Sequence, residues 1–400
     1  MQRDYDCIVV GGGPAGLHFA REIVSDSEFS VAVLERNDDL RDNDKSTGGT
    51  FPEVIDRYDI SHEVVMGEND TITFEGPTER SRLDIGGYVL DFPALLAFLG
   101  SDAKSCGADV YTGTTVTEPI IENGAMRGVR YRDSDGGGEL RGKITVDASG
   151  PSAVISSDLG HFDTETARRG IGLEYEIEGE YETNDTMLFK FDHTIAPGGY
   201  AWTFPAGKDA FKAGVCWVDD FHAARENGNS IHDYVERWVR DDPRWNVGEI
   251  RAKHAGEGVW NNSINQRATD GFVAIGDAAS SINPLFGEGI RPGLASAEMA
   301  ATVVRTALAT DDVSEGRLRE YERRWNEKRG QRWRLQRLLS DLLYDFSESQ
   351  QDSFVKRVGR LSTTKAERLR RYDLGLFELV KLYPFRVKDV AKAPKLVRQL

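Results

Sequence analysis

A glycine-rich turn near the N-terminus has the residue types and spacing of a phosphate-binding loop. An apolar, strand-like run, Tyr5–Val10, leads directly into Gly11-Gly12-Gly13-Pro14-Ala15-Gly16, and a helix-like segment follows. Gly11 permits a tight turn, Gly13 lets the backbone approach a pyrophosphate, and Gly16 lets the helix pack against the sheet. The N-terminus of that helix would add free N–H groups and a positive dipole end. The turn therefore predicts a dinucleotide-binding βαβ unit.

A carboxylate completes this unit. The helix-like segment runs from Leu17 to about Val24, and a second strand-like run, Val31–Leu34, ends at Glu35. A carboxylate at the tip of the second strand can accept hydrogen bonds from both hydroxyls of an adenosine ribose, and its charge disfavours a 2′-phosphate. The sequence therefore favours FAD or NAD over NADP. The predicted cofactor-binding residues of this unit are Gly11, Gly13, Pro14, Ala15, Gly16, Glu35 and Arg36.

A second stretch that could do chemistry lies far along the chain. The strand-like run Gly271–Ile275 leads into Gly276-Asp277, and a helix-like pattern from Leu294 to Leu308 comes later. A helix that begins near Gly287–Gly289 would direct the positive end of its dipole at a ligand bound in front of it. The predicted cofactor-binding residues of this stretch are Asp277, Gly287, Gly289 and Ile290.

These two stretches together resemble the FAD-dependent oxidoreductases related to para-hydroxybenzoate hydroxylase and glutathione reductase. In that group a late strand ends in Gly-Asp, and the acid hydrogen-bonds the ribityl chain of FAD, a role that the resemblance carries over to Asp277. The resemblance implies that FAD is the cofactor, with the late helix directed at the N1/C2=O edge of the reduced flavin. Hydroxylases of the group carry an Asp-Gly pair followed by Arg. Here Asp147-Ala148-Ser149-Gly150 has no such Arg, which weakens the interpretation as an aromatic hydroxylase.

The middle of the chain alternates like an antiparallel sheet with one covered face. The strand-like runs are Ile171–Ile177, Thr186–Phe191, Tyr200–Phe204 and Ala213–Val218. Because strand side chains alternate, Tyr200, Trp202 and Phe204 are predicted to share one face. They form either a core stripe or a wall for a long apolar ligand.

This aromatic strand narrows the resemblance. Tyr-x-Trp-x-Phe-Pro at 200–205, followed by Gly214, resembles the motif of the geranylgeranyl reductases, which use FADH2 to saturate the double bonds of polyprenyl chains, including archaeal ether-lipid tails. Lys45–Thr50 resembles the family's Lys-x-Cys-Gly-Gly loop near the flavin, and Asn283–Ile290 matches its Asn-Pro-hydrophobic-x-Gly-Glu-Gly-Ile pattern. The resemblance covers roughly residues 4–310.

Two positions depart from the family pattern. Cys216 stands at the second glycine of the usual Gly-x-Gly, and Thr47 stands where a cysteine often lies. The catalytic candidates that the resemblance implies are Tyr200, as a possible proton donor, Trp202 and Thr47. The flavin-side candidates are Gly48, Gly49 and Val116, and the substrate-binding candidates are Tyr200, Trp202, Phe204, Pro284 and Phe286.

Several functions stay open beside a polyprenyl reductase. Another flavoenzyme of the same fold, either a monooxygenase or a quinone-linked dehydrogenase, fits the cofactor motifs. A non-catalytic prenyl-lipid carrier that kept the fold and lost FAD is a third alternative, and the retained Glu35, Asp277 and motif glycines count against it. A flavin halogenase fits less well, because Tyr200 replaces the first Trp of the halogenase Trp-x-Trp-x-Ile-Pro element. A reductase of this family would need an external electron donor, either ferredoxin or a reduced nicotinamide.

The charge and cysteine content limit the partners and the compartment. The chain has 400 residues and a net charge of −16, which argues against a nucleic-acid partner. The spread of acids favours a salt-adapted, halophilic surface or an ordinary acidic cytosolic protein. The 3 cysteines lack metal-ligand spacing and indicate a reducing compartment. No apolar run reaches the ~18–20 residues of a membrane span, and no signal peptide precedes the first strand. The prediction is a cytoplasmic protein, with peripheral membrane contact as an option.

The C-terminal fifth is helix-like and basic. Apolar residues recur at spacings of three and four over 313–345, and a second helical pattern runs from Ser353 to about Arg371. The tail Leu376–Arg386 is apolar and basic together before Pro394 interrupts it. Residues 321–400 carry 20 Lys and Arg against 10 Asp and Glu. A basic and apolar end of this kind is typical of a segment that binds an anionic surface, such as a membrane leaflet or an acidic protein. It is equally typical of amphipathic helices whose basic face is exposed to solvent.

These features together predict an α/β fold with α+β insertions. It comprises a Rossmann-like FAD-binding domain, an antiparallel-sheet substrate domain and a helical C-terminal region. The predicted boundaries are 1–60, 86–160 and 265–310 for the FAD-binding domain, 61–85 and 161–264 for the substrate domain, and 311–400 for the helical region.

Overall fold

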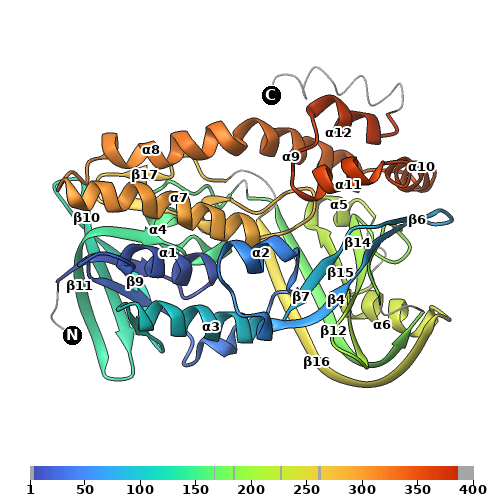
Figure 1. The fold of residues 1–400 in the computed structure, drawn as a ribbon, viewed down its shortest axis with the longest axis horizontal. Coiled ribbons are helices and arrows are strands. Elements are labelled where there is room, and N and C mark those ends of the chain that lie inside the picture. Colours follow the sequence, from blue (N-terminus) through green and yellow to red (C-terminus); the bar gives the residue numbers. More distant parts are fainter. Residues whose placement is uncertain (1–3, 166, 183–184, 226–227, 260–262, 386–400) are drawn as a thin grey trace. The chain divides into compact units, whose positions relative to one another are not determined.

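The chain folds into two compact units, each built from three separate segments (Figure 1). The computed structural model describes residues 4–165, 167–182, 185–225, 228–259 and 263–385. Unit 1 comprises Met1–Asp44, Phe92–Ala167 and Gly258–Gly330, and unit 2 comprises Lys45–Asp91, Arg168–Glu257 and Gln331–Leu400. Parallel strands dominate one unit and antiparallel pairs the other, which confirms the predicted fold class.

Unit 1 is built on a sheet with a parallel centre. Its strands are, in spatial order, β17 (Ala268–Thr269), β18 (Phe272–Ala274), β11 (Gly136–Asp147), β1 (Asp4–Val10), β2 (Val31–Leu34) and β8 (Asp109–Tyr111). The antiparallel strands β9 (Thr115–Glu122) and β10 (Ala125–Asp133) extend from β11. The parallel pairs β18–β11–β1–β2 place the carboxyl ends of the strands at one edge, where ligands bind in doubly wound sheets.

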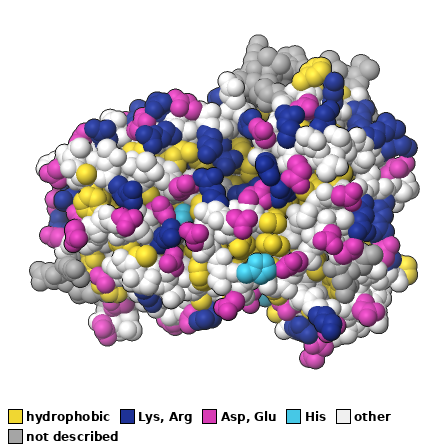
Figure 2. Space-filling view, in the orientation of Figure 1, with side chains coloured by type: hydrophobic (Ala, Val, Ile, Leu, Met, Phe, Trp, Pro, Cys, Tyr) yellow, Lys and Arg dark blue, Asp and Glu magenta, His cyan; other side chains and the backbone are white. Residues whose placement is uncertain are grey.

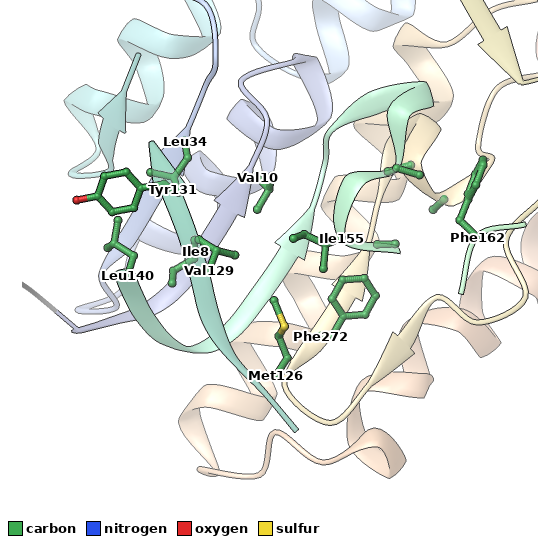
Figure 3. Close-up of a cluster of buried hydrophobic side chains, with 14 of the residues drawn as sticks. Ile8, Val10, Leu34, Met126, Val129, Tyr131, Leu140, Ile155, Phe162 and Phe272 are labelled. Carbon is green, nitrogen blue, oxygen red and sulfur yellow. The ribbon is translucent and has the colours of Figure 1, made fainter. Parts of the chain in front are cut away.

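Helices pack on this sheet and bury its apolar strands. The helices of unit 1 are α1 (Pro14–Val24), α3 (Phe92–Ser105), α4 (Val154–Asp158), α7 (Ile290–Ala309) and α8 (Glu315–Trp325), with short turns η1 (Leu40–Asp42), η3 (Gly150–Ser152), η4 (Gly276–Ala279) and η5 (Asn326–Gly330). Helix α1 packs against α3 and α7. Figure 3 shows part of the core, where Ile8 lies beside Val129 and Met126 beside Phe272; all four are at most 3% exposed.

Unit 2 contains two sheets. The larger has the order β16 (Trp245–Val259), β12 (Arg169–Tyr181), β15 (Ala210–Val218), β14 (Gly199–Pro205), β13 (Thr186–Lys190), β5 (Thr71–Glu75) and β6 (Arg80–Leu83). The smaller consists of β3 (Gly49–Thr50), β7 (Gly87–Leu90) and β4 (Val65–Asn69), and short helices α2 (Pro52–Arg57), η2 (His62–Val64) and α5 (Asp219–Ala223) lie in the connections. The predicted antiparallel pairing is confirmed for β12, β15, β14 and β13 and for β5 with β6, while β13 pairs with β5 in parallel.

One face of the larger sheet is covered by helix α6 (Ile231–Asp241). Tyr175, Val215 and Trp217 point to this side and pack with Tyr234 and Trp238 of α6, all at most 5% exposed. Because side chains alternate along a strand, the neighbouring positions of β12, β14 and β15 lie on the opposite face. That opposite face carries the candidate site of unit 2.

The C-terminal segment of unit 2 is helical. It contains α9 (Gln331–Tyr344), α10 (Glu348–Val358), α11 (Thr363–Arg370) and α12 (Leu376–Leu382). The helical pattern predicted over 353–371 corresponds to two helices, because α10 ends at Val358 before the C-cap Gly359 and α11 begins at Thr363 after the N-cap Ser362. Arg386 and Pro394, on which the tail prediction also rested, lie outside the described residues. Within the described ranges, no helix combines the length and apolarity that crossing a bilayer requires.

Candidate active site

The N-terminal glycine turn of unit 1 has the close backbone contacts that its sequence indicates. Gly11 has φ +108°, and a Cβ placed there would lie 2.4 Å from the Ala148 carbonyl oxygen. A Cβ at Gly16 would lie 2.1 Å from the Gly11 carbonyl oxygen, so neither position has room for a side chain. A Cβ at Gly13 would meet no atom within 4 Å. Gly11 and Gly16 therefore shape the turn, while Gly13 leaves open space at the start of α1.

That open space borders an uncapped helix end and a buried carboxylate. Helix α1 begins with Pro14, and its N-cap residue is Gly13, which has no side chain to cap the helix. Glu35, 8% exposed, accepts hydrogen bonds from the backbone N–H of Gly12 at 2.7 Å and of Asn37 at 3.0 Å. Each carboxylate oxygen has a second lone pair, so Glu35 keeps the capacity to accept further hydroxyl donors. Free N–H groups beside an acceptor suit a phosphate and a ribose.

The late Gly-Asp segment of unit 1 lies against the start of α1. A Cβ at Gly276 would lie 2.9 Å from the Ala15 side chain, and the Gly276 N–H donates to Ser296 of α7 at 2.8 Å. Asp277 points to the N-terminus of α7, since both its carboxylate oxygens lie 3.5 Å from a Cβ placed at Gly289. The N-cap residue of α7 is Gly289, which has no side chain to cap the helix. Two segments far apart in the sequence thus bring two helix N-termini and a carboxylate to one edge of the sheet.

The turn between Asp277 and α7 is held by its own polar groups. The buried Asn283 side chain accepts hydrogen bonds from the backbone N–H of Leu285 and Phe286, each at 3.0 Å. Glu288 and Arg291 form a two-pronged ion pair at 3.0 and 2.6 Å. The Asn-Pro and Gly-Glu-Gly parts of this motif therefore rigidify the approach to α7.

Asp147, at the end of β11, has a positioning role within unit 1. Its fully buried carboxylate accepts hydrogen bonds from the backbone N–H and hydroxyl of both Ser149 and Ser156, at 2.5 to 3.1 Å. These bonds fix the turn whose Ala148 contacts Gly11. The small residues after Asp147 thus support the glycine turn.

In unit 2, Tyr200, Trp202 and Phe204 share one face of β14, as predicted. The rings of Tyr200 and Trp202 lie 5.9 Å apart between centroids, and Phe189 of β13 lies 5.8 Å from Tyr200 and 5.2 Å from Phe204. Phe191 lies 6.0 Å from Tyr200. We call these residues (Phe189, Phe191, Tyr200, Trp202, Phe204) the aromatic face.

The strand register explains why glycine occupies position 214, after the aromatic motif. Gly214 of β15 pairs with Trp202 on one side and with Glu174 of β12 on the other. A Cβ at Gly214 would lie 2.1 Å from the indole of Trp202, so the indole lies directly over this glycine. It reaches across β15 to donate its Nε1–H to Glu174 at 2.7 Å. The motif therefore requires glycine because the tryptophan passes over it.

Glu174 and Lys212 are the polar residues of this face that the sequence analysis missed. They are 3% and 4% exposed, and their charged atoms lie 3.8 Å apart. Glu174 also accepts a 2.5 Å hydrogen bond from the Thr47 hydroxyl, and Lys212 donates to the Thr47 carbonyl at 3.1 Å. Alternation along 171–177 places Glu174 on a face, but nothing local in the sequence identifies its partners on three other segments.

The Thr47 loop packs on the aromatic face. A Cβ at Gly49 would lie 2.7 Å from the Phe204 ring, and a Cβ at Gly48, where φ is +79°, would lie 2.1 Å from the Leu90 carbonyl oxygen. The loop therefore needs both glycines to lie this close. Thr47 and Trp202 are both predicted catalytic candidates, and both donate hydrogen bonds to the same carboxylate oxygen of Glu174.

Tyr200 and Cys216 face each other across the register of β14 and β15. Burial raises the pKa of the Tyr200 hydroxyl well above its usual range. Burial likewise raises the pKa of the Cys216 thiol to about 12. Both groups therefore stay protonated near neutral pH, and Tyr200 is a weaker acid than an ordinary tyrosine. Its role as proton donor stays a prediction.

The remaining candidates lie in unit 1. Val116 packs against the core of Figure 3, and Arg36 is exposed beside Glu35. Pro284 is buried, and Phe286 is half-buried in the turn before α7. Their predicted contacts with cofactor or substrate stay predictions.

Residues 164–256 match the family model of the geranylgeranyl reductase catalytic domain, a range that nearly coincides with the middle segment of unit 2. The digeranylgeranylglycerophospholipid reductase of Haloferax volcanii is 34% identical over 378 residues, covering 90% of this chain and 91% of that protein. That of Methanosarcina acetivorans is 27% identical and covers 98% of both chains.

Solved structures share the fold. A geranylgeranyl bacteriochlorophyll reductase-like protein from Thermoplasma acidophilum superposes with a TM-score of 0.85 at 22% identity, over 100% of both chains. A flavin-dependent brominase superposes with a TM-score of 0.74 at 15% identity, over 100% of both chains. The fold is therefore one that flavin-dependent enzymes use. With the identity and coverage of the Haloferax relative, the chain belongs to the geranylgeranyl reductase family, which includes the digeranylgeranylglycerophospholipid reductases.

Proposed function

We propose that the protein is an FAD-dependent oxidoreductase that reduces the C=C double bonds of polyprenyl, geranylgeranyl-type chains of membrane lipids or their precursors. The observation that carries this proposal is the Trp202–Gly214–Glu174 arrangement, an aromatic face with a buried acid fixed against it. The names of the relatives, digeranylgeranylglycerophospholipid reductases, support the same substrate class.

Unit 1 is proposed to hold the FAD. The open space at Gly13 and the uncapped start of α1 fit the pyrophosphate, Glu35 fits the adenosine ribose, and Asp277 fits the ribityl chain. When bound and reduced, FAD supplies a hydride to one carbon of the double bond. The bound FAD is proposed to be reduced by an external electron donor, either ferredoxin or a reduced nicotinamide.

Removing the Asp277 carboxylate should weaken FAD binding without unfolding the protein. Loss of a hydrogen bond to a charged group costs ~1.5–3 kcal/mol, so Asp277→Ala should raise the FAD dissociation constant about 10- to 100-fold. Fluorescence titration of the apoprotein with FAD measures this change. Asp311→Ala is the control, since that side chain of unit 1 is 85% exposed. Equal FAD affinity in Asp277→Ala and the parent protein would contradict the placement.

Unit 2 is proposed to bind the prenyl chain along its aromatic face. Aromatic rings offer large apolar area with few rotatable bonds, and each buried CH₂ of a ligand contributes about 0.8 kcal/mol. An isolated alkene has no carbonyl to polarise, so the protein must hold both carbons by packing and supply a proton. The buried Trp202 and Phe204 suit this holding role.

An anaerobic half-reaction tests the function. The purified protein is reduced without oxygen and mixed with an unsaturated prenyl lipid, and the visible flavin spectrum is followed. The proposal expects the flavin to be reoxidised by the lipid alone. Reoxidation that needs oxygen, with a hydroxylated product, would indicate a monooxygenase instead. A protein purified without visible flavin absorption, and unable to bind added FAD, would indicate a carrier.

The end of unit 2 is proposed to contact the membrane that carries the substrate. Phe377 of α12 is 73% exposed and Phe385 is 43% exposed, and the Lys381 ammonium lies 4.5 Å from the Phe377 ring centroid. Figure 2 shows further Lys and Arg side chains over the C-terminal helices. Exposed aromatic rings beside cations are typical of helices that lie at an anionic lipid surface.

Replacing Phe377 should weaken this contact. Burying one large apolar side chain contributes ~1.5–3 kcal/mol, so Phe377→Ser should lower partitioning onto phosphatidylglycerol vesicles about 10- to 100-fold. Co-sedimentation of the protein with these vesicles measures the partitioning. Ile121→Ser, which removes a 50% exposed apolar side chain of unit 1, is the control. Equal partitioning of both variants, or no preference over phosphatidylcholine vesicles, would contradict the contact.

A further inference from the structure

The aromatic face of unit 2 contains a buried acid, Glu174, and a buried amine, Lys212, that packing does not explain. Glu174 and Lys212 point to the same side of the sheet as Trp202 and Phe204, and both are nearly inaccessible to solvent. Desolvating two charges costs several kcal/mol, and an apolar pair of similar volume is often as stable or more so. A buried acid on the face that is proposed to bind an apolar chain therefore points to a chemical role.

The two carboxylate oxygens of Glu174 have different surroundings. Oε2 accepts hydrogen bonds from the Thr47 hydroxyl at 2.5 Å and the Trp202 indole at 2.7 Å. Oε1 is buried and accepts no hydrogen bond from any residue that the structure describes. The Lys212 side-chain nitrogen lies 3.8 Å from Oε1 and donates a hydrogen bond to the Thr47 carbonyl. Two donors thus fix Oε2, while Oε1 is the atom with room for a proton.

A second acid on the same face of the sheet, Glu176, is more exposed to solvent than Glu174. Glu176 lies two residues along β12, is half-buried, and lies 3.9 Å from the His254 imidazole. The neighbouring His254 imidazole, with Lys212 nearby, lowers the pKa of Glu176. Charged groups therefore line β12 and β15 from the half-exposed Glu176 to the buried Glu174, and Lys212 lies between them.

We infer that Glu174 is the acid that delivers the proton in prenyl-chain reduction, an inference that rests on the proposed function. FAD, when bound and reduced, would supply the hydride for one alkene carbon. The Oε1–H bond of Glu174 breaks and its proton forms the second C–H bond, so the π bond is consumed and Glu174 is left as a carboxylate. A proton from solvent then reaches Oε1 through Lys212, which restores the neutral acid. Thr47 and Trp202 are positioning residues that hold Oε2.

The Glu174→Gln variant tests this role. The glutamine carbonyl can still accept from Thr47 and Trp202, but the side chain cannot release a proton. General acids contribute ~10²–10⁴-fold, so the reduced variant should reoxidise with the lipid at least ~100-fold more slowly, with FAD content and lipid affinity unchanged. Glu174→Asp, which keeps the acid, should recover part of the rate. Glu178→Gln is the matched control, since it removes a half-exposed carboxylate of the same strand face.

A second readout does not use turnover. In the oxidised, lipid-bound protein, the infrared difference between parent and Glu174→Gln should contain the C=O stretch of a protonated carboxyl, and the difference for Glu178→Gln should lack it. Absence of that band, or a Glu174→Gln variant as fast as the parent, would overturn the inference and leave the proposed function standing. A parent protein that leaves the lipid unreduced would overturn the proposed function, and the inference with it.

Discussion

Replacing Gly214 with alanine should abolish most lipid reduction while FAD stays bound. The added Cβ would lie 2.1, 2.5 and 2.6 Å from three ring atoms of Trp202, so the indole must move off β15. It would then lose its 2.7 Å hydrogen bond to Glu174. A displacement of about 1 Å at a reacting site costs ~100-fold, which sets the expected loss of single-turnover rate. Stopped-flow reoxidation by an unsaturated prenyl lipid measures that rate.

Gly172→Ala is the matched control for this change. Gly172 lies on the same face, and a Cβ there would lie 3.5 Å from both Trp202 and Cys216, an ordinary contact. Its rate should stay within a few-fold of the parent. If Gly214→Ala and Gly172→Ala reduced the lipid equally well, the position of the Trp202 indole would be irrelevant to the reaction. Flavin absorbance per protein reports FAD content in both variants and should not change, because the proposed FAD site belongs to unit 1.

Two alanine substitutions in the glycine turn of unit 1, Gly16→Ala and Gly13→Ala, should both weaken FAD binding, but only Gly16→Ala should also destabilise the fold. Gly16→Ala places a Cβ 2.1 Å from the Gly11 carbonyl oxygen, so the backbone must shift and the start of α1 is lost as a phosphate site. We expect purified Gly16→Ala to lack bound FAD and to be destabilised by ~1–3 kcal/mol. Urea denaturation and flavin content measure the two effects.

Gly13→Ala separates cofactor binding from folding. A Cβ at Gly13 meets no protein atom within 4 Å, so the variant should unfold at the same urea concentration as the parent. The same methyl group projects into the space proposed for the pyrophosphate, and FAD affinity should fall at least ~10-fold, about 1.4 kcal/mol. Unchanged FAD affinity in Gly13→Ala would place the pyrophosphate elsewhere.

Local pattern was enough to predict the cofactor half of the fold. The strand Val31–Leu34 is observed with its predicted bounds, and β1 begins one residue before the prediction. Such segments are short, apolar and bounded by glycine or a charged residue, so neighbouring residues determine them. The proposed late site was also predictable, because Gly276-Asp277 directly follows a buried strand.

Long-range pairing was the part that the sequence could not predict. Glu174, Lys212 and Thr47 become neighbours only through the register of β12 and β15 and the path of an early loop, and no local pattern encodes that register. The parallel pairing of β13 with β5 has the same origin. The break at Gly359–Ser362 was missed because apolar spacing continues through it, although serine before α11 is a frequent N-cap residue.

Mass spectrometry of an unsaturated prenyl lipid after one anaerobic turnover with the prereduced protein most directly tests whether this chain reduces C=C bonds with FAD. The predicted result is a lipid that has gained a pair of hydrogen atoms at a double bond, in an amount equal to the flavin reoxidised. A lipid of unchanged mass, or one that changes only by gaining oxygen when air is admitted, would contradict it.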